Sequence, residues 1–566
     1  MSRFAIGLDF GTNSCRSLIV DLANGRELAS HVFNYPTGEA GVVITPDDPN
    51  QARQNPADYL TGIEVTVREA VKKARSVSPD FSPDDVIGIG VDTTGSSPMP
   101  VDPKGVPLCF NDAFKNRPAA MVWLWKDHTS HAEAERITEA ASKAHPEYLA
   151  KIGGVYSSEW FWSKIWHCQK EDPQVFDAAF EFIEICDWIP AVLVGNTNPG
   201  EIKRSICAAG HKAMYNSRWG GFPDPAFLDN ISTGLGKLRR RMPSSAFSAA
   251  ERAGCLCEEW AERLGLSANV AVAVGAFDAH MGAVGAGIKA GTLVKILGTS
   301  TCDIMVWPND KKLADIPGVC GIVDGSVMDG YYGIEAGQSA VGDIFLWFVN
   351  NLVPNTYGGT TEERFLKLEN AAAELKPGES GLIALDWNNG NRTILVDARL
   401  TGLILGQTLH TQPHEVYRAL VEATAFGALA IIDRIEEYGV SINEVVNCGG
   451  LTVKNPLLMQ IYADVTGRPM KVSRSEQTPA LGAAIFGAIS AGRDSSGFET
   501  IDQAQAAITG TSKVYESNRE NHEIYKALYA VYRQLHDGFG TSGWRGSMYN
   551  VMKSLLDLRD KVRREK

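Results

Sequence analysis

The feature that most constrains the fold of this chain is a short pattern that occurs twice, once at the start and once near the middle. Gly11-Thr12-Asn13-Ser14-Cys15 and Gly298-Thr299-Ser300-Thr301-Cys302 align without a gap, with Gly, Thr and Cys in register. Each segment lies between two apolar runs, which is typical of a tight turn between strands. Recurrence of one local pattern favours an internal duplication over chance. A chain of 566 residues is also too long for one hydrophobic core, so we expect two related domains.

Helix and strand patterns alternate along both halves of the chain. Asn55-Pro56 has the residue types preferred at the start of a helix, and apolar side chains recur behind it at helical spacing. Residues 86–91 predict a buried strand that ends at Asp92. In the second half we expect a long helix over residues 415–438 and a strand over residues 444–448. This alternation predicts an α/β fold with a largely parallel sheet in each half and functional groups at the strand C-termini.

These patterns divide the chain into three parts. The N-terminal strands, at residues 5–9, 18–20 and 28–35, read as an antiparallel meander. We expect a first domain over residues 1–285, a second over residues 286–520, and a helical, charged appendage over residues 521–566.

Composition excludes several classes of protein. A net charge of −13 argues against nucleic acid as the main partner, because phosphate backbones are bound through basic patches. No uncharged apolar run is long enough to span a membrane, and the N-terminus has no signal-peptide pattern, so we expect a cytoplasmic protein. The ten cysteines are scattered and contain no C-x-x-C, which predicts reduced thiols and no zinc site. His128 and His131 are better explained by a solvated helix start than by a metal pair.

Both repeated turns have residues suited to phosphate binding. Glycine lets the backbone approach an anion closely, and amides with Thr and Ser hydroxyls can donate to phosphate oxygens. Asp9 stands at the tip of the strand before the first turn, where it is placed to hold Mg²⁺ directly or through water. A plain hairpin turn is the alternative. If the two halves are related, the turns at residues 11–14 and 298–300 face each other and clamp a triphosphate.

Other nucleotide-binding signatures are missing. There is no G-x-x-x-x-G-K-[ST] loop, and Asp9-Phe10-Gly11 is not preceded by the H-R-D segment of protein kinases. Gly88-Ile-Gly90 lacks the third glycine of a dinucleotide-binding turn. A third glycine turn, Gly449-Gly450, follows the strand predicted at residues 444–448, and its flat surface suits an adenine ring.

The three turns in this order, with Ala480-Leu481-Gly482 behind them, resemble the FGGY carbohydrate kinases. The resemblance covers residues 7 to about 488. It implies two actin-like (ribonuclease H-like) domains with a cleft between them, and ATP and Mg²⁺ as cofactors. By similarity, the first phosphate loop is Gly11, Thr12 and Asn13, the second is Gly298, Thr299 and Ser300, and the adenosine site contains Gly449, Gly450 and Asn455.

A catalytic base is expected at the boundary between the domains. Phosphorylation of a hydroxyl requires in-line positioning, charge neutralisation and a proton acceptor. Residues 270–277 read as a strand that ends in Asp278, just before a glycine-rich helix. The segment Gly275-Ala276-Phe277-Asp278 resembles the base motif of the family, so we assign Asp278 as general base. An N-cap aspartate is the alternative, and His280 is assigned a structural role.

Several smaller segments carry hints of the sugar substrate. They include Tyr156-Ser-Ser-Glu-Trp160 and Trp219-Gly-Gly221, and within the family they resemble the L-ribulokinases more than the glycerol kinases or xylulokinases. The resemblance implies that a ketopentose is surrounded by Gly95, Ser96, Trp125, Lys212, Asp278 and Glu335.

We therefore expect ATP-dependent phosphorylation of L-ribulose to L-ribulose 5-phosphate, which serves arabinose catabolism. Another ketopentose or polyol kinase, such as a D-ribulokinase or xylulokinase, is the alternative within the family. An actin-like ATPase or chaperone is the alternative from another class. A homodimer is left open.

Overall fold

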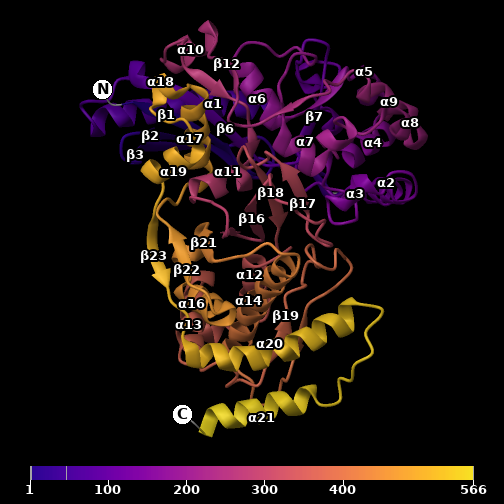
Figure 1. Cartoon of the computed structure of the whole chain (residues 1–566), viewed down its shortest axis with the longest axis vertical. Coiled ribbons are helices and arrows are strands. Elements are labelled where there is room, and N and C mark those ends of the chain that lie inside the picture. Colours follow the sequence, from indigo (N-terminus) through magenta and orange to yellow (C-terminus); the bar gives the residue numbers. More distant parts are fainter. Residues whose placement is uncertain (1–2, 46–47, 565–566) are drawn as a thin grey trace.

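The computed structural model describes residues 3–45 and 48–564, which form a mixed α/β molecule built around two large sheets (Figure 1). This confirms the predicted α/β class. In Figure 1, the first half of the chain lies at the top and most of the second half lies below it. Within the described residues no helix is long and apolar enough to cross a membrane.

The first sheet contains the predicted N-terminal meander, in which β2 pairs antiparallel with β1 and β3. Strand β6 runs parallel to β1 on the side of β1 away from β2, in agreement with the largely parallel sheet that the alternation of helices and strands predicts. The strands, in spatial order, are β12 (Arg252–Cys255), β13 (Ala271–Ala273), β6 (Val86–Thr93), β1 (Phe4–Phe10), β2 (Ser14–Asp21) and β3 (Glu27–Asn34), with β14 (Ala276–Phe277) also paired to β6.

The second sheet repeats this arrangement. Strand β15 pairs antiparallel with β16 and parallel with β21, as β1 does with β2 and β6. The turn at Gly298 therefore occupies the same place in its sheet as the turn at Gly11. The strands, in spatial order, are β17 (Gly321–Asp324), β18 (Tyr331–Ala336), β16 (Thr301–Pro308), β15 (Thr292–Leu297), β21 (Glu444–Cys448), β22 (Met470–Ser473) and β23 (Thr511–Tyr515).

Four smaller sheets complete the strand inventory of the described residues. They are β4 (Val43–Thr45) with β5 (Asp48–Gln54) and β8 (Val122–Trp123), β7 (Pro98–Val101) with β9 (Glu181–Glu184), β10 (Arg204–Ser205) with β11 (Ala246–Phe247), and β19 (Ile383–Leu385) with β20 (Leu403–Leu405).

Helices cover both sheets. Those of the first half are α1 (Pro56–Val77), α2 (His131–Ala144), α3 (Glu147–Ala150), α4 (Phe161–Glu171), α5 (Pro173–Ala178), α6 (Ile185–Leu193), α7 (Ile206–Lys212), α8 (Pro225–Ile231), α9 (Thr233–Arg239), α10 (Glu258–Leu264) and α11 (Asp278–Gly285). Those of the second half are α12 (Gly342–Asn351), α13 (Thr361–Ala373), α14 (Pro413–Glu437), α15 (Gly450–Lys454), α16 (Pro456–Thr466), α17 (Thr478–Ser490), α18 (Arg493–Ser496), α19 (Ile501–Ile508), α20 (Arg519–Gly540) and α21 (Val551–Arg564).

Helix α17 comes from the second half of the sequence but packs on the first sheet, in yellow-orange beside β1 in Figure 1. Glycines on the strands permit this approach. A Cβ atom at Gly7 would lie 1.7 Å from the carbonyl oxygen of Ala480, and one at Gly90 would lie 1.8 Å from that of Ala483. Side chains of α11 and α17 join residues of both sheets in one apolar cluster, so the two helices form the connection between the halves.

Local predictions and structure agree in most places. Asn55 accepts a hydrogen bond from the amide of Ala57 at the start of α1, and the helix expected over residues 415–438 is α14. The strand expected over residues 270–277 is wrong as a single element, because it is interrupted between β13 and β14. The C-terminal part is helical, as predicted: α20 packs against α16, and α21 lies at the lower edge of the molecule (Figure 1).

Candidate active site

Three carboxylates meet at the C-terminal ends of the central strands of the first sheet. Asp9 on β1 and Asp92 on β6 are direct partners in the parallel pair, and Asp278 follows β14, which also pairs with β6. Asp9 forms an ion pair of 3.1 Å with Arg16. Asp92 is fully buried, and neither of its oxygens has a hydrogen-bond partner in the described part of the chain. Sequence reasoning placed Asp92 at a strand end but gave it no role.

The charges of Asp9 and Asp278 disfavour ionisation of Asp92, and the charge of Asp9 disfavours ionisation of Asp278. Burial raises the pKa of Asp9, and Arg16 only partly opposes this. Burial, with the charges of Asp9 and Asp278, raises the pKa of Asp92 well above its ordinary value. Burial and the charge of Asp9 raise the pKa of Asp278 to about 7. A hard divalent cation with oxygen ligands would relieve this repulsion and supply the partner that the Asp92 oxygens lack, so the residues present fit Mg²⁺.

Asp278 is the first residue of α11, and Phe277 is the N-cap residue of that helix. One carboxylate oxygen of Asp278 accepts a hydrogen bond of 2.6 Å from the amide of Ala279, which fixes the orientation of the group. Asp278 therefore both binds the helix start and presents a carboxylate that is part-exposed. A pKa near 7 suits a group that accepts a proton at neutral pH.

A buried ion pair joins the two halves of the chain beside Asp278. The ammonium of Lys212, at the end of α7, lies 2.9 and 3.1 Å from the two carboxylate oxygens of Glu335 on β18. Burial alone would raise the pKa of Glu335, but opposing contributions, of which the charge of Lys212 is the largest, hold that pKa well below its usual range. Both charges are thus maintained in the interior, where they can act as fixed hydrogen-bonding groups.

The segment that carries Gly95 and Ser96 is held against this cluster. A Cβ atom at Gly95 would lie 1.7 Å from the ring of Phe277, so only glycine permits the segment to pass beside the base. The Ser96 hydroxyl donates to the carboxylate of Glu184, and the amide of Ser97 donates to the same group at 2.6 Å. The Ser96 side chain is therefore occupied within the protein.

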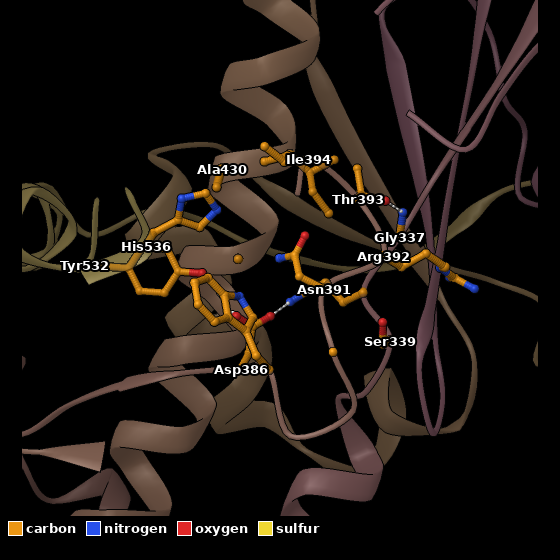
Figure 2. Close-up of a pocket in the computed structure, with 15 residues that line it drawn as sticks. Gly337, Ser339, Asp386, Asn391, Arg392, Thr393, Ile394, Ala430, Tyr532 and His536 are labelled. Carbon is orange, nitrogen blue, oxygen red and sulfur yellow. Dashed lines mark hydrogen bonds between the residues drawn. The ribbon is translucent and has the colours of Figure 1, made fainter. Parts of the chain in front are cut away.

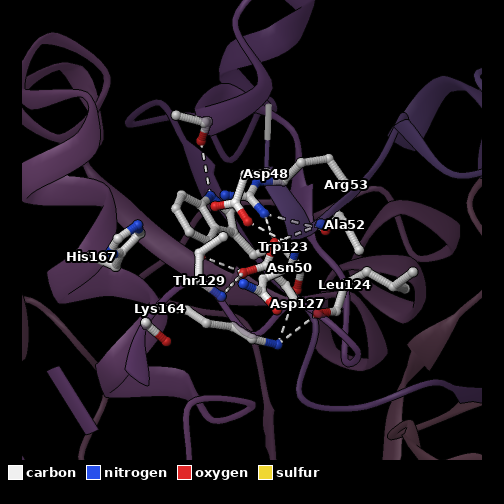
Figure 3. Close-up of polar contacts among 12 residues, drawn as sticks. Asp48, Asn50, Ala52, Arg53, Trp123, Leu124, Asp127, Thr129, Lys164 and His167 are labelled. Atoms are coloured by element: carbon white, nitrogen blue, oxygen red, sulfur yellow. Dashed lines mark hydrogen bonds and ion pairs between the residues drawn. The ribbon is translucent and has the colours of Figure 1, made fainter. Parts of the chain in front are cut away.

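Trp125 connects the expected sugar pocket to the first phosphate loop. Its indole nitrogen donates to the Thr12 hydroxyl at 3.0 Å. The segment before it is fixed by Lys164, whose buried ammonium donates to the carbonyl oxygen of Leu124 at 2.7 Å (Figure 3). The same ammonium donates to the carbonyl oxygen of Ser96 at 2.8 Å. Burial lowers the pKa of Lys164 to about 7, although the charge of Glu184 opposes it.

A second buried group supports the same segment. Arg53 forms an ion pair with Asp127, and its guanidinium lies 3.4 Å from the ring centroid of Trp123 (Figure 3). Asp127 also accepts hydrogen bonds from the amide of Ala52 and the hydroxyl of Thr129. Sequence reasoning missed this arrangement because its members are brought together only by tertiary contacts.

Each phosphate turn is closed by a backbone hydrogen bond from its first glycine, and the second turn is one residue shorter than the first. The amide of Gly11 donates to the carbonyl of Ser14 at 2.9 Å, and the amide of Gly298 donates to that of Ser300 at 3.0 Å. Thr12 and Thr299 stand at the tips of these turns, and Thr299 is exposed. The Asn13 side chain donates to the carbonyl of Ala40.

The second turn is linked to the C-terminal helix α20 through a chain of hydrogen bonds. The backbone amide of Gln338 donates to the hydroxyl of Thr301, and the backbone amide of Thr301 donates to the carbonyl of Gln338. The side-chain amide of Gln338 donates to a carboxylate oxygen of Asp386 at 2.7 Å. Tyr532 of α20 donates to the other oxygen of Asp386 at 3.0 Å. Gln338, Asp386 and Tyr532 are among the residues that line a small pocket (Figure 2), so α20 contributes to its wall.

The third glycine turn lies directly behind the second phosphate turn. Gly449 has φ of 95°, and a Cβ atom there would lie 2.4 Å from the carbonyl oxygen of Leu297, so glycine is required. A Cβ atom at Gly450 would meet nothing within 4 Å, which leaves an open surface. Asn455 is buried, caps α16 through the amide of Leu458, and donates to the hydroxyl of Tyr417.

Comparisons with known proteins identify the family of this chain. Residues 4–285 match the N-terminal domain, and residues 293–491 the C-terminal domain, of the FGGY family of carbohydrate kinases. A ribulokinase of Shouchella clausii is 44% identical over 100% of this chain and 99% of that protein. A ribulokinase of Vibrio parahaemolyticus is 42% identical over 94% of this chain and 95% of that protein.

Solved structures show the same fold at lower identity. Xylulose kinase from Rhodospirillum rubrum superposes with a TM-score of 0.74 at 21% identity, over 95% of this chain and 99% of that one. The structure of Plasmodium falciparum glycerol kinase with ADP superposes with a TM-score of 0.74 at 16% identity, over 96% of this chain and 99% of that one. The predicted two-domain kinase fold and ATP-using sugar kinase class are thereby confirmed. This chain belongs to the FGGY family of carbohydrate kinases.

Proposed function

We propose that the enzyme transfers the γ-phosphoryl group of ATP to L-ribulose and releases L-ribulose 5-phosphate, the step by which L-arabinose breakdown yields a phosphorylated ketopentose. The observation that carries this is the buried Lys212–Glu335 pair beside Asp278, to which both halves of the chain contribute. Similarity over the full chain to proteins named ribulokinase supports the choice of sugar.

In the proposed mechanism, Asp278 accepts the proton of the sugar O5 hydroxyl as that oxygen attacks the γ-phosphorus. Its hydrogen bond from Ala279 keeps one oxygen oriented, which places the reacting groups with little entropy cost. The raised pKa makes the carboxylate a stronger base than an ordinary aspartate, and it still ionises at neutral pH. Proton transfer of this kind contributes about 10² to 10⁴ in rate.

The other sugar hydroxyls are assigned to groups around Asp278. Lys212 donates to, and Glu335 accepts from, hydroxyls of the ketopentose. Trp125 provides an apolar ring face, held by its bond to Thr12. Gly95 and Ser96 act through their backbone, since the Ser96 hydroxyl is bound to Glu184.

The nucleotide is assigned to the three glycine turns. Amides and hydroxyls of Gly11, Thr12 and Asn13 from one domain, and of Gly298, Thr299 and Ser300 from the other, bind the phosphates. The adenine lies on the open surface at Gly450, beside Gly449. Asn455 positions this turn through its bonds to Leu458 and Tyr417.

Asp9 and Asp92 would hold Mg²⁺ at the strand ends. When bound, the ion neutralises charge on the transferring phosphoryl group. The buried Asp92 oxygens without protein partners support its inclusion in this site.

We further propose that residues 1–285 and 286–520 act as two domains that close on the substrates and exclude water, because water competes with the sugar hydroxyl for the phosphoryl group. We place the enzyme in the cytoplasm, where ATP is available and the charged product is retained. Light scattering determines whether it is a homodimer.

A coupled assay of ADP formation tests this function. L-Ribulose, D-ribulose, D- and L-xylulose, ribitol and glycerol are compared at equal concentration, with Mg·ATP alone as the control. We expect the highest kcat/KM for L-ribulose and slow hydrolysis without sugar. Highest activity with another ketopentose or polyol would transfer the proposal to that substrate, and fast sugar-independent hydrolysis would favour an actin-like ATPase.

A further inference from the structure

A buried cluster of two imidazoles and a carboxylate lies beside the base. His211 comes from α7, His280 from α11 and Glu335 from β18, and their exposed fractions are 0%, 2% and 6%. The imidazole ring centroids are 4.5 Å apart. One ligand-capable atom of each residue lies within 4.8 Å of those of the other two.

Three of the four ring nitrogens of this cluster have no hydrogen-bond partner in the described structure. Neither ring nitrogen of His280 has a hydrogen-bond partner there, and neither does Nδ1 of His211. A buried polar atom without a partner costs about 1–3 kcal/mol. Three such atoms around one carboxylate indicate that a polar ligand belongs between them.

The neighbours of His211 bear on which of its ring nitrogens carries the proton. Its Nε2 lies 3.0 Å from the hydroxyl oxygen of Ser326, and that hydroxyl donates to the carbonyl of Val323 at 3.2 Å. In the tautomer that donates from Nε2 to Ser326, the lone pair of Nδ1 faces Glu335, which is the form that a metal ion at Nδ1 requires. Nδ1 lies 3.3 Å from Glu335 Oε2, and His280 Nε2 lies 3.8 Å from the same oxygen.

Both imidazoles are in the form that binds metals. Burial lowers the pKa of His280 to about 4, although the charge of Glu335 opposes it. Burial and the neighbouring His280 lower the pKa of His211 well below its ordinary value. At neutral pH two neutral imidazoles therefore face an ionised carboxylate.

We propose that His211 Nδ1, His280 Nε2 and the Glu335 carboxylate form a binding site for a divalent transition-metal ion of the Zn²⁺ type. Ligand bonds of about 2.0–2.2 Å at tetrahedral angles place ligand atoms about 3.3–3.5 Å apart. Two of the separations here, 3.3 and 3.8 Å, are close to that spacing. Ser326 orients the His211 ring from outside the site, as hydrogen-bond acceptors of metal-binding histidines do.

The ammonium of Lys212 opposes this site, because it binds the same carboxylate. A metal ion there breaks the Lys212–Glu335 pair. If that pair binds the sugar, as proposed above, Zn²⁺ inhibits the enzyme in competition with the sugar. Mg²⁺ prefers oxygen ligands in octahedral geometry, so the Mg²⁺ that accompanies ATP does not occupy the site.

The test is a Co²⁺ titration of the whole enzyme with excess Mg²⁺ and without sugar or ATP, followed by visible d–d absorption and by calorimetry. We expect one site. His280→Gln and His211→Gln should weaken it at least about tenfold. Lys212→Met should tighten it by about tenfold or more, because a repelling charge is removed. The matched control is the double variant His128→Gln/His131→Gln, which removes a stacked imidazole pair elsewhere and should bind Co²⁺ as the wild type does.

Absence of a site in the wild type, or unchanged affinity in His280→Gln, would overturn the proposal. So would loss of the site in the control variant. If the histidine variants do not fold, crystals of the wild type soaked in Zn²⁺ decide the matter by anomalous scattering. A peak between His211, His280 and Glu335 supports the site, and its absence there contradicts it. Because these readouts need no substrate, they stand whichever sugar the enzyme phosphorylates.

Discussion

Replacement of Asp278 by asparagine separates a catalytic base from a helix-capping residue. Asparagine has nearly the same size, and its side-chain oxygen can still accept the hydrogen bond from Ala279. It cannot accept the proton of a sugar hydroxyl. General-base catalysis contributes about 10² to 10⁴ in rate, which corresponds to about 3–5 kcal/mol of transition-state stabilisation. We therefore expect kcat to fall at least about 100-fold, with little change in the affinity for ATP analogue or sugar.

Although Asp278→Asn should lower kcat, it should not lower the stability of the fold. Burial and Asp9 raise the folded-state pKa of Asp278 to about 7, from 3.8. A carboxyl group with a raised pKa favours the folded state in its protonated form, so its effect becomes destabilising as pH rises through the window from about 4 to 7. Asp278→Asn removes this charge. It should be about as stable as the wild type at pH 4, and at least as stable at pH 8.

The pH dependence of activity provides the third readout. In the wild type, kcat/KM for the sugar should rise with pH and reach half its plateau near pH 7, because only the ionised carboxylate accepts a proton. The residual activity of Asp278→Asn should lack this step. Coupled assays at saturating Mg·ATP and denaturant unfolding at both pH values measure these effects. A variant that keeps near-wild-type kcat but unfolds more easily at pH 8 would show that Asp278 serves only the helix start.

Three further predictions follow from the same geometry. Lys212→Met should lower the free energy of unfolding by about 3–5 kcal/mol and abolish binding of the sugar but not of an ATP analogue. The double variant Lys212→Met/Glu335→Met should regain stability without regaining sugar binding. A Lys212→Met variant as stable as the wild type contradicts this. Asp9→Asn should raise the Mg²⁺ concentration needed for half-maximal rate and leave stability unreduced, since burial raises the pKa of this carboxyl group; an unchanged Mg²⁺ requirement removes Asp9 from the metal site. Gly450→Val should leave the melting temperature little changed, because a Cβ atom there meets nothing within 4 Å. It should raise KM for ATP by about tenfold through overpacking against adenine; an unchanged KM places the adenine elsewhere.

Sequence reasoning succeeded where neighbouring residues determine the structure. The turns at Gly11 and Gly298 were predicted because each carries its own glycine between two strands, and in each the glycine amide donates to a carbonyl further along the turn. The ungapped alignment did not show that the second turn is one residue shorter. The helix cap at Asn55 is likewise a contact between residues two positions apart. These features depend on local chemistry that a single sequence contains.

Features that depend on distant segments were not predictable. Gly88 and Gly90 were considered only as an incomplete dinucleotide motif, yet their role is to admit the backbone of α17, nearly 400 residues away in sequence. Asp92 stood at the end of a predicted strand, but its position opposite Asp9 required the parallel pairing of β1 and β6. His280 was assigned a structural role because nothing in the sequence shows that its ring nitrogens lack partners.

The most direct test of the proposed site is a crystal structure with L-ribulose, Mg²⁺ and a non-hydrolysable ATP analogue bound together. The sugar O5 hydroxyl should lie within hydrogen-bond distance of the Asp278 carboxylate, about 2.6–3.2 Å, and face the γ-phosphate. Lys212 and Glu335 should contact the other hydroxyls of the sugar, and both phosphate turns should bind the triphosphate. A sugar bound away from Asp278, or a triphosphate held by only one of the two turns, would contradict the account.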